Sequence, residues 1–201
     1  MAEDRRDLIV VGERVALGPL RRDLAETYAR WVNDLEVRHG LMNAGLATAP
    51  SEEAWVEESA KKMAQREPGE AHFTIYDRED EAPAGIVSLM GISHLLGSSR
   101  FGILLGERRG RGLGGEATRL ALDWAFHVLG LHNVMLEVMA WNERAIRAYE
   151  RAGFRRIGLR RGALVSMGER CDELLMDAIA PELGAWVLRP REQPGEPPTP
   201  G

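Results

Sequence analysis

The feature that most constrains this chain is a glycine-rich stretch, Gly106–Ala117, between an apolar run and a helical run. The apolar run is Phe101–Leu105 and the helical run is Thr118–Leu129, so the order predicts a strand, a loop and a helix. Glycines at positions 110, 112, 114 and 115 permit positive φ and close approach, so several backbone N–H groups can point at one anion. The start of the helix adds the positive end of its dipole. We expect a bound pyrophosphate, with mobile positive charge at the rim from Arg108, Arg109 and Arg111.

Two common glycine-rich signatures do not fit this stretch. A P-loop ends in Gly-Lys-Ser/Thr, where the lysine reaches phosphate and the hydroxyl holds magnesium, whereas this loop ends in Gly114-Gly115-Glu116. The dinucleotide signature can be forced on Gly110, Gly112 and Gly115, but it should open a doubly wound domain with an acidic residue about 20 positions on. Here Asp123 lies inside the predicted helix, so the context is wrong.

Composition limits the class of protein. At 201 residues the chain is long enough for one domain and short for two, and we expect a domain over residues 1–188 with a disordered Pro/Gly-rich tail over 189–201. The formal net charge of −5 gives no basic footprint for nucleic acid. The single cysteine, Cys171, excludes a disulfide framework and a multi-cysteine metal site, and we expect no metal. With no apolar signal core and no membrane-length apolar run, the predicted location is cytoplasmic, away from membranes.

The remaining chain predicts strands on both sides of the loop. Leu8–Val11 and Arg14–Leu17 indicate a short hairpin or one bent strand, and Ala71–Tyr76 and Gly85–Ile92 an antiparallel hairpin. Asn133–Ala140 is apolar on both faces, which is typical of a central strand. Two further strands are expected at Phe154–Leu159 and Cys171–Ile179, joined by a turn near Gly168.

Two helices before the first long hairpin are expected to form a lid over one side of a site. Asp23 is a suitable N-cap for the first, and Ser51, followed by two glutamates, for the second. The polar segment between them, Asn33–Pro50, indicates a loop or a broken helix.

A second motif follows the loop. Asn142–Phe154 begins with a helix-capping residue, places Ala145, Ile146 and Tyr149 inward, and has Gly153 where the helix should end. Its pattern, Asn-x-x-Ala-x-x-x-Tyr-x-x-x-Gly-Phe, resembles the second signature of the GNAT superfamily of N-acetyltransferases. The loop itself, Arg-x-x-Gly-x-Gly from position 109, resembles the first signature, which holds the pyrophosphate of acetyl-coenzyme A. Two motifs in register are far more specific than one.

The resemblance covers about Leu17 to Ile179, and Asp172–Met176 after a charged turn is most similar to the RimJ/RimL-type branch. Members of that branch acetylate protein α-amino groups, polyamines, amino acids or antibiotics. The implied fold is α+β (mixed α/β): a mostly antiparallel sheet of about seven strands with a splayed parallel pair, flanked by about four helices.

The resemblance also implies roles for individual residues. Strands Arg100–Leu105 and Asn133–Ala140 would be parallel neighbours that splay apart, with acetyl-coenzyme A in the gap. The first strand would pair with the pantetheine arm through its main chain, Asn142 would hydrogen-bond the pantetheine, and Tyr149 would stand near the sulfur. The expected cofactor-binding residues are Ile103, Leu104, Leu105, Arg109, Gly110, Arg111, Gly112, Leu113, Gly114, Gly115, Asn142 and Ala145.

The implied reaction is direct transfer, in which a neutral amine attacks the thioester carbonyl, a main-chain N–H polarises it, and the thiolate leaves. Tyr149 is the expected catalytic residue, because a phenol of pKa about 10 can protonate a thiolate of pKa about 8.5 when the hydrogen bond is preorganised. Related enzymes often place a glutamate base on the strand before the loop, where this chain has Arg100. His72, Ser88 and His94 are alternatives, as groups that hold a proton-accepting water.

Other side chains remain open. Glu137 alternates on the central strand and faces either the site or a helix. Cys171 has no base beside it in sequence and is expected to be an inert thiol. Four polar residues of the predicted lid either contact the substrate or are solvated: Asp34, Glu36, Arg38 and His39.

Two alternatives to an acetyltransferase remain. A non-catalytic acyl-coenzyme A-binding sensor is favoured by Arg100, which stands where a carboxylate is common. A succinyl-coenzyme A donor needs a cation near the acyl terminus, which Arg100 or Arg38 would supply. The expected partner is an amine substrate, either a small molecule or a protein N-terminus, and a homodimer through the last two strands is a family-based expectation.

Overall fold

The computed structural model describes residues 8–41, 45–166 and 168–183. The frayed N-terminus (1–7) and the disordered tail (189–201) predicted from the sequence lie outside these ranges. The elements in chain order are β1 (Val10–Val11), β2 (Val15–Pro19), η2 (Arg22–Leu24), α1 (Ala25–Asn33), α2 (Leu35–Gly40), α3 (Ala49–Met63), β3 (Glu70–Asp77), β4 (Ala82–Ser93), β5 (Ser98–Leu105), α4 (Leu113–Asp123), η3 (Trp124–Val128), β6 (Asn133–Met139), α5 (Glu143–Ala152), β7 (Arg155–Ser166), β8 (Glu169–Ile179) and η4 (Ala180–Glu182).

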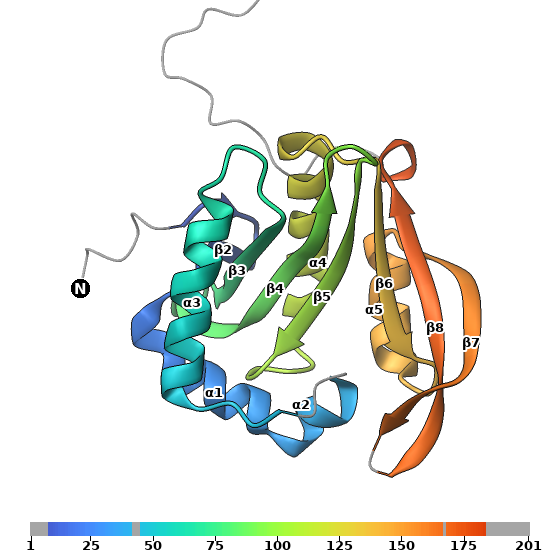
Figure 1. The fold of residues 1–201 in the computed structure, drawn as a ribbon, viewed down its shortest axis with the longest axis horizontal. Coiled ribbons are helices and arrows are strands. Elements are labelled where there is room, and N and C mark those ends of the chain that lie inside the picture. Colours follow the sequence, from blue (N-terminus) through green and yellow to red (C-terminus); the bar gives the residue numbers. More distant parts are fainter. Residues whose placement is uncertain (1–7, 42–44, 167, 184–201) are drawn as a thin grey trace, which may run out of the picture.

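All strands belong to one sheet, in the order β1-β2-β3-β4-β5-β6-β8-β7 (Figure 1). Neighbouring strands are antiparallel except β5 and β6, which are parallel. The predicted mixed fold with one parallel pair is therefore confirmed. The described residues hold eight strands and five α-helices, more than the predicted numbers, because the first hairpin gives two strands and the broken segment forms α2.

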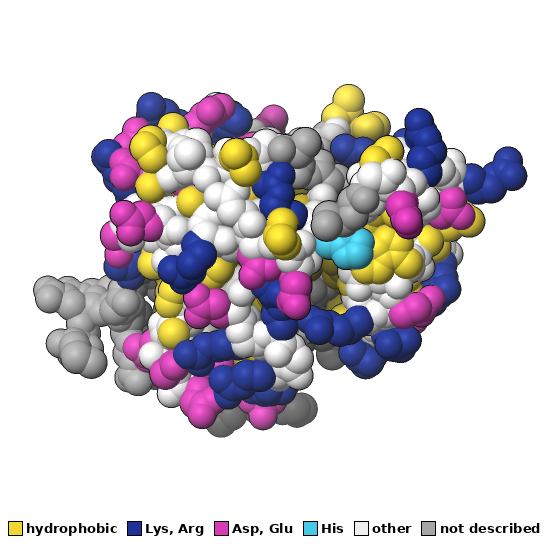
Figure 2. All heavy atoms as spheres, turned by 90° about the horizontal axis from the view of Figure 1, so that it is seen from below, with side chains coloured by type: hydrophobic (Ala, Val, Ile, Leu, Met, Phe, Trp, Pro, Cys, Tyr) yellow, Lys and Arg dark blue, Asp and Glu magenta, His cyan; other side chains and the backbone are white. Residues whose placement is uncertain are grey.

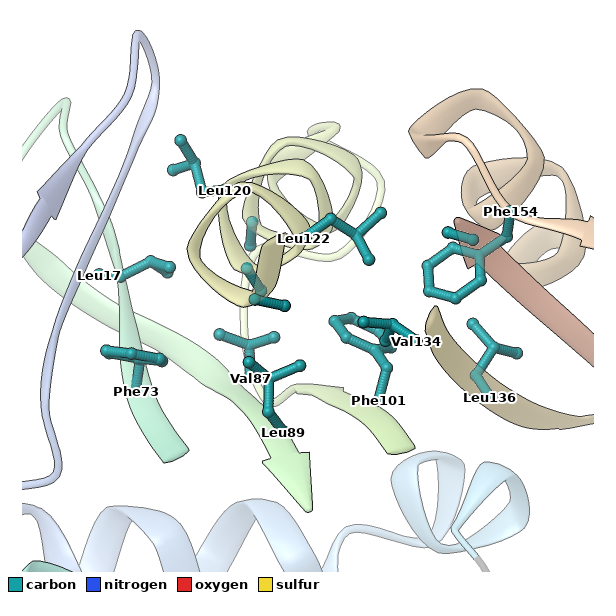
Figure 3. Close-up of a cluster of buried hydrophobic side chains, with 14 of the residues drawn as sticks. Leu17, Phe73, Val87, Leu89, Phe101, Leu120, Leu122, Val134, Leu136 and Phe154 are labelled. Carbon is teal, nitrogen blue, oxygen red and sulfur yellow. The ribbon is translucent and has the colours of Figure 1, made fainter. Parts of the chain in front are cut away.

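Helices cover both faces of the sheet, with α3 on one face and α4 and α5 on the other (Figure 1). The larger core lies between the sheet and α4, where Val87, Leu89 and Phe101 point from the strands toward the helix that carries Leu120 and Leu122 (Figure 3). Successive side chains of a strand point to opposite faces of the sheet, so the alternate residues face a smaller cluster under α1 and α3. Its buried members are Leu20, Tyr28, Trp31, Val56 and Ile86.

The starts of the two lid helices differ from the prediction. Asp23 does not cap α1, because Arg21 binds its carboxylate (Nε to Oδ1, 3.0 Å) and a short 3-10 turn precedes the helix. Helix α3 begins after Thr48 rather than at Ser51. The Ser51 N–H donates to Thr48 Oγ1 at 3.3 Å and the Thr48 N–H donates to Ser51 Oγ at 2.9 Å, which is a capping box.

The later elements follow the prediction more closely. Asn142 caps α5 and Gly153 ends it at φ 115°, as expected. The last hairpin is longer than predicted, since β7 continues to Ser166 and β8 begins at Glu169. Helix α4 begins at Leu113 and passes into the π-helical turn η3.

Candidate functional site

The sheet opens between its two parallel strands. The pairing of β5 with β6 runs from Ser98 to Arg100 and stops there. Beyond this point β5 continues along β4, and β6 continues along β8 (Figure 1). The edge of Phe101–Leu105 that faces β6 therefore has no partner strand among the described residues. It offers main-chain groups to an extended ligand, as the sequence resemblance predicted for a splayed pair.

The start of helix α4 lies beside this open edge. Gly112, the N-cap, is left-handed (φ 81°) and provides no capping side chain, so within the described ranges the first-turn N–H groups of α4 have no side-chain cap. A Cβ on Gly114 would lie 2.9 Å from Leu105 Cδ1, so the start of α4 lies close against β5 and a side chain here would displace the end of Leu105. A Cβ on Gly110 or Gly115 would meet no atom within 4 Å. Free N–H groups at a helix start, with open space in front of them, fit a pyrophosphate.

The loop arginines are held by carboxylates, which corrects the prediction of mobile charge. Arg108 and Arg111 both contact Asp77 Oδ2, at 2.9 and 3.0 Å. The N–H of Glu79, followed by these two guanidiniums, holds the pKa of Asp77 below its usual range. The further carboxylates that pair with Arg108 and Arg111 are Asp80 and Glu79.

Arg109 connects the loop to helix α2. Its guanidinium donates to the Leu105 carbonyl at 2.9 Å and pairs with Asp34 at 3.2 Å and with Glu36. Asp34 also caps α2, since its Oδ1 accepts from the Glu36 N–H at 2.8 Å. These two acidic residues of the predicted lid thus hold the loop. Viewed from the end where α2 lies, the surface carries intermingled basic and acidic side chains (Figure 2).

Helix α5 brings the second motif to the head of the opening. The Tyr149 ring packs edge-on against Phe101, the first β5 residue beyond the paired segment, with ring centroids 6.1 Å apart. No described residue forms a hydrogen bond with the Tyr149 hydroxyl, and burial raises the pKa of Tyr149 to about 12. The phenol therefore keeps its proton and can donate it to a ligand. At the start of the helix, Asn142 Oδ1 accepts from the Ala145 N–H at 3.2 Å.

A cavity of about 500 Å³ lies on the opposite face of β5, under α3. Gly102 and Leu104 form part of its wall, so it borders the strand segment that β6 leaves free. Most of the side chains that line it are apolar, and they include Val32, Leu46, Trp55, Ile86, Met90 and Leu104. Its polar side chains among the described residues are Ser51, Glu52, His72 and Ser88.

Three polar side chains form a chain of contacts from this cavity outward. Ser88 Oγ lies 2.8 Å from His72 Nδ1, and His72 Nε2 lies 3.5 Å from Glu70 Oε1. Burial lowers the pKa of His72, while Glu70 opposes that shift. His72 is therefore neutral at pH 7 and can accept a proton. The sequence had suggested His72 and Ser88 separately, whereas Glu70 was missed.

Several candidates from the sequence lie elsewhere. His94 Nε2 contacts the Pro68 carbonyl at 3.0 Å, and His39 stacks on Trp141 with ring centroids 4.2 Å apart. Arg38 donates to the Gly45 carbonyl at 2.8 Å. Cys171 lies in the β7–β8 hairpin, opposite Leu164.

The remaining open residue, Glu137, faces the side of the sheet that holds the cavity and pairs with Arg100 at 2.8 Å. Glu52 was seen in the sequence only as a charge in the first turn of a helix, and its position in the cavity wall was missed. No group of three or more potential metal ligands gathers within the described ranges, and none of their helices is long and apolar enough to cross a membrane.

A mixed sheet whose parallel strands separate beside a glycine-rich helix start is the architecture that the sequence resemblance predicted. The model of the acetyltransferase (GNAT) domain matches residues 14–155. The chain therefore belongs to the GNAT acetyltransferase family.

Individual relatives agree with this assignment. A probable N-acetyltransferase of Bacillus subtilis, YjcK, is 34% identical over 115 residues, which are 56% of this chain and 64% of that protein. Spermidine N(1)-acetyltransferase of Escherichia coli K12 is 40% identical over 76 residues, 37% of this chain and 41% of that protein. The matched segment thus spans less than two thirds of either relative.

Solved structures share the fold. Spermidine N-acetyltransferase from Vibrio cholerae in complex with CoA and spermine has a TM-score of 0.75 at 23% identity, covering 85% of this chain and 98% of that one. Mycobacterium smegmatis RimJ in complex with CoA-disulfide has a TM-score of 0.77 at 23% identity, covering 90% and 89%. At these identities the likeness concerns the fold alone.

Proposed function

We propose that the protein transfers the acetyl group of acetyl-coenzyme A directly to a primary amine. The observation that carries this proposal is the opening of β5 from β6 after Arg100, directly beside the uncapped start of α4. Membership of the GNAT family supports it. When bound, the coenzyme supplies a thioester whose carbonyl is open to attack by a neutral amine and whose thiolate can leave.

The donor side is formed by β5, α4 and α5. The free main-chain edge of Ile103, Leu104 and Leu105 holds the pantetheine arm, and an N–H of this edge polarises the thioester carbonyl. The N–H groups of Leu113, Gly114 and Gly115 hold the pyrophosphate. The loop residues Arg109, Gly110, Arg111 and Gly112 enclose it, and Asn142 and Ala145 border the arm at the start of α5.

The acid and the base act from opposite faces of β5. Tyr149, whose hydroxyl has no hydrogen-bond partner among the described residues, donates its proton to the departing sulfur. On the cavity side, neutral His72 accepts the proton of the incoming ammonium through Ser88, and Glu70 stabilises the imidazolium that forms. In this assignment His72 takes the role of the base that related enzymes often place on the strand before the loop. This chain has Arg100 there, and its guanidinium pairs with Glu137.

Isothermal titration with acetyl-coenzyme A tests the proposal first, and absence of binding at millimolar concentration would rule it out. Free-thiol release over a panel of amines then separates an enzyme from a non-catalytic acyl-coenzyme A sensor. Competition between acetyl- and succinyl-coenzyme A identifies the donor. We expect acetyl to win, because Arg100 and Arg38, the cations suggested for a succinyl group, are both engaged within the protein.

A further inference from the structure

Glu52 is the one carboxylate among the described residues that line the cavity under α3. Among the described residues none forms an ion pair or a side-chain hydrogen bond with Glu52, although other glutamates of α3 are paired: Glu57 with Arg22, and Glu58 with Lys62, both at 2.8 Å. The Glu52 side chain is half-buried, and burial raises the pKa of its carboxyl. An unpaired carboxylate in a partly desolvated wall is costly unless a ligand completes it.

The rest of the wall gives this carboxylate an apolar setting. Trp55, Ile86, Met90 and Leu104 present carbon surface, and no lysine or arginine of the described chain lines the cavity. The hydroxyl of Ser51 is engaged in the capping box with Thr48. A ligand here therefore has one position for a positive charge and room for a compact apolar body.

The cavity also lies where an acceptor must enter. Gly102 and Leu104 of its wall belong to the β5 segment whose other edge is free, and Ser88 stands opposite Gly102 in the β4–β5 register. Resting on the proposed acetyl transfer, we propose that the acceptor is a primary monoamine carried on a compact apolar body, with its ammonium held by Glu52 before the amine reaches Ser88 and His72. Glu52 is thus a specificity-determining residue.

The proposed acceptor differs from a polyamine, the substrate class in the names of the spermidine acetyltransferases from Escherichia coli and Vibrio cholerae. A polyamine carries several ammonium groups along one flexible chain, and each that enters an apolar cavity needs its own carboxylate or water. The described wall offers one. A second ammonium that lies against the buried Ile86 side chain loses its hydration without compensation.

Calorimetric titration of amines into protein saturated with coenzyme A tests the assignment without requiring turnover. The probes are benzylamine, its neutral analogue benzyl alcohol, spermidine, and a dialanine peptide amide with a free N-terminus. The variant is Glu52→Gln, and the matched control is Glu57→Gln on the outer side of the same helix. Thermal unfolding of each variant confirms that the fold is kept.

We expect benzylamine to bind at least roughly tenfold more tightly than spermidine or the peptide, since only the monoamine avoids stranding a second polar group. Glu52→Gln should raise the Kd of benzylamine roughly tenfold or more, because a charge-assisted hydrogen bond is lost. The same change should leave the Kd of benzyl alcohol within about twofold, as should Glu57→Gln for benzylamine.

Preferred binding of spermidine or of the peptide overturns the assignment, as does a benzylamine Kd that Glu52→Gln leaves unchanged or the absence of binding by any probe. These failures leave the proposed acetyl transfer standing, provided that acetyl-coenzyme A binds and some amine releases thiol. Failure of acetyl-coenzyme A itself to bind rejects the proposed function and this inference together.

Discussion

Arg100 on β5 and Glu137 on β6 are joined by an ion pair of 2.8 Å across the point where the two strands part. The last strand pairing is between Arg100 and Met135, one residue before the free edge begins. The Glu137 side chain is only 12% exposed, whereas that of Arg100 is 59% exposed. The pair links the two halves of the sheet at the head of the opening, and it leaves Arg100 with a structural partner where related enzymes often have a base.

Breaking this pair should destabilise the fold by a measurable amount. Arg100→Met leaves the Glu137 carboxylate nearly buried and without its cation, and we expect a loss of about 1 kcal/mol, moderated by the exposure of the arginine. In a Glu137→Gln background the same change should cost much less. Chemical denaturation of the two single variants and the double variant measures the coupling. A coupling energy near zero would show that the pair contributes nothing to the connection between strands.

The glycines of the loop allow a cleaner test of coenzyme binding than a simple block at Gly112. A side chain at Gly112 is strained by its φ of 81° and would also lie 3.2 Å from Arg14 Nη1, so its effect on binding is mixed with an effect on the loop. Gly115 has neither problem, since an added Cβ meets no atom within 4 Å.

We therefore predict that Gly115→Ala keeps or raises thermal stability, by about 0.5–1 kcal/mol, because alanine favours the helix. The methyl group would extend into open space at the first turn of α4, beside the proposed pyrophosphate, so the Kd for coenzyme A should rise roughly tenfold or more. Titration calorimetry with coenzyme A measures the second effect. An unchanged Kd would place the pyrophosphate elsewhere.

The parts of this structure that local sequence predicts are the glycine loop and the Asn142 helix. In both, the deciding residues are a few positions apart: positive-φ glycines permit the turn, and Asn142 caps its own helix. The predicted start of α3 at Ser51 rested on the Ser51 hydroxyl alone. In the structure Ser51 and Thr48 form a capping box together, and the helix begins after Thr48. Short-range patterns thus give the element and leave its boundary open.

Contacts across the sheet were beyond such patterns. The carboxylates that hold Arg109 lie 73 or more residues earlier in the chain, and His72 meets Ser88 only because β3 pairs with β4. Glu52 looks like any acidic residue near a helix start until the packing of α3 on β3 turns it into the cavity. Such assignments depend on which strands are neighbours, and a single sequence does not contain that order.

Tyr149→Phe tests the proposed acid with little disturbance of the fold. Phenylalanine keeps the ring contacts with Phe101 and Phe154, at 6.1 and 5.9 Å, and the lost hydroxyl leaves no described partner unsatisfied. We expect kcat to fall by roughly 10² or more, while the Kd for coenzyme A and the thermal midpoint stay unchanged. Steady-state kinetics with calorimetry measures both. A variant with normal kcat would show that Tyr149 only packs.

The pH profile tests the proposed base. Burial lowers the pKa of His72 below the ordinary value of about 6.5, Glu70 at 3.5 Å raises it, and Lys62, which lies 3.6 Å from Glu70, lowers it. Neutral His72 accepts the proton, so kcat at saturating substrates should be level near pH 7 and fall as the pH drops through a midpoint below 6.5. Removing the opposing carboxylate in Glu70→Gln should move this midpoint lower still.

Across the cavity, burial raises the pKa of the Glu52 carboxyl, so Glu52 is a second group whose protonation would lower the rate as the pH drops. The profile of Glu52→Gln is therefore the control, and it should keep the acid limb. His72→Gln should remove the limb and lower kcat by roughly 10², the usual effect of losing a general base. If the limb survives in His72→Gln but disappears in Glu52→Gln, the proton passes to Glu52 instead, and the contact between Ser88 and His72 is structural.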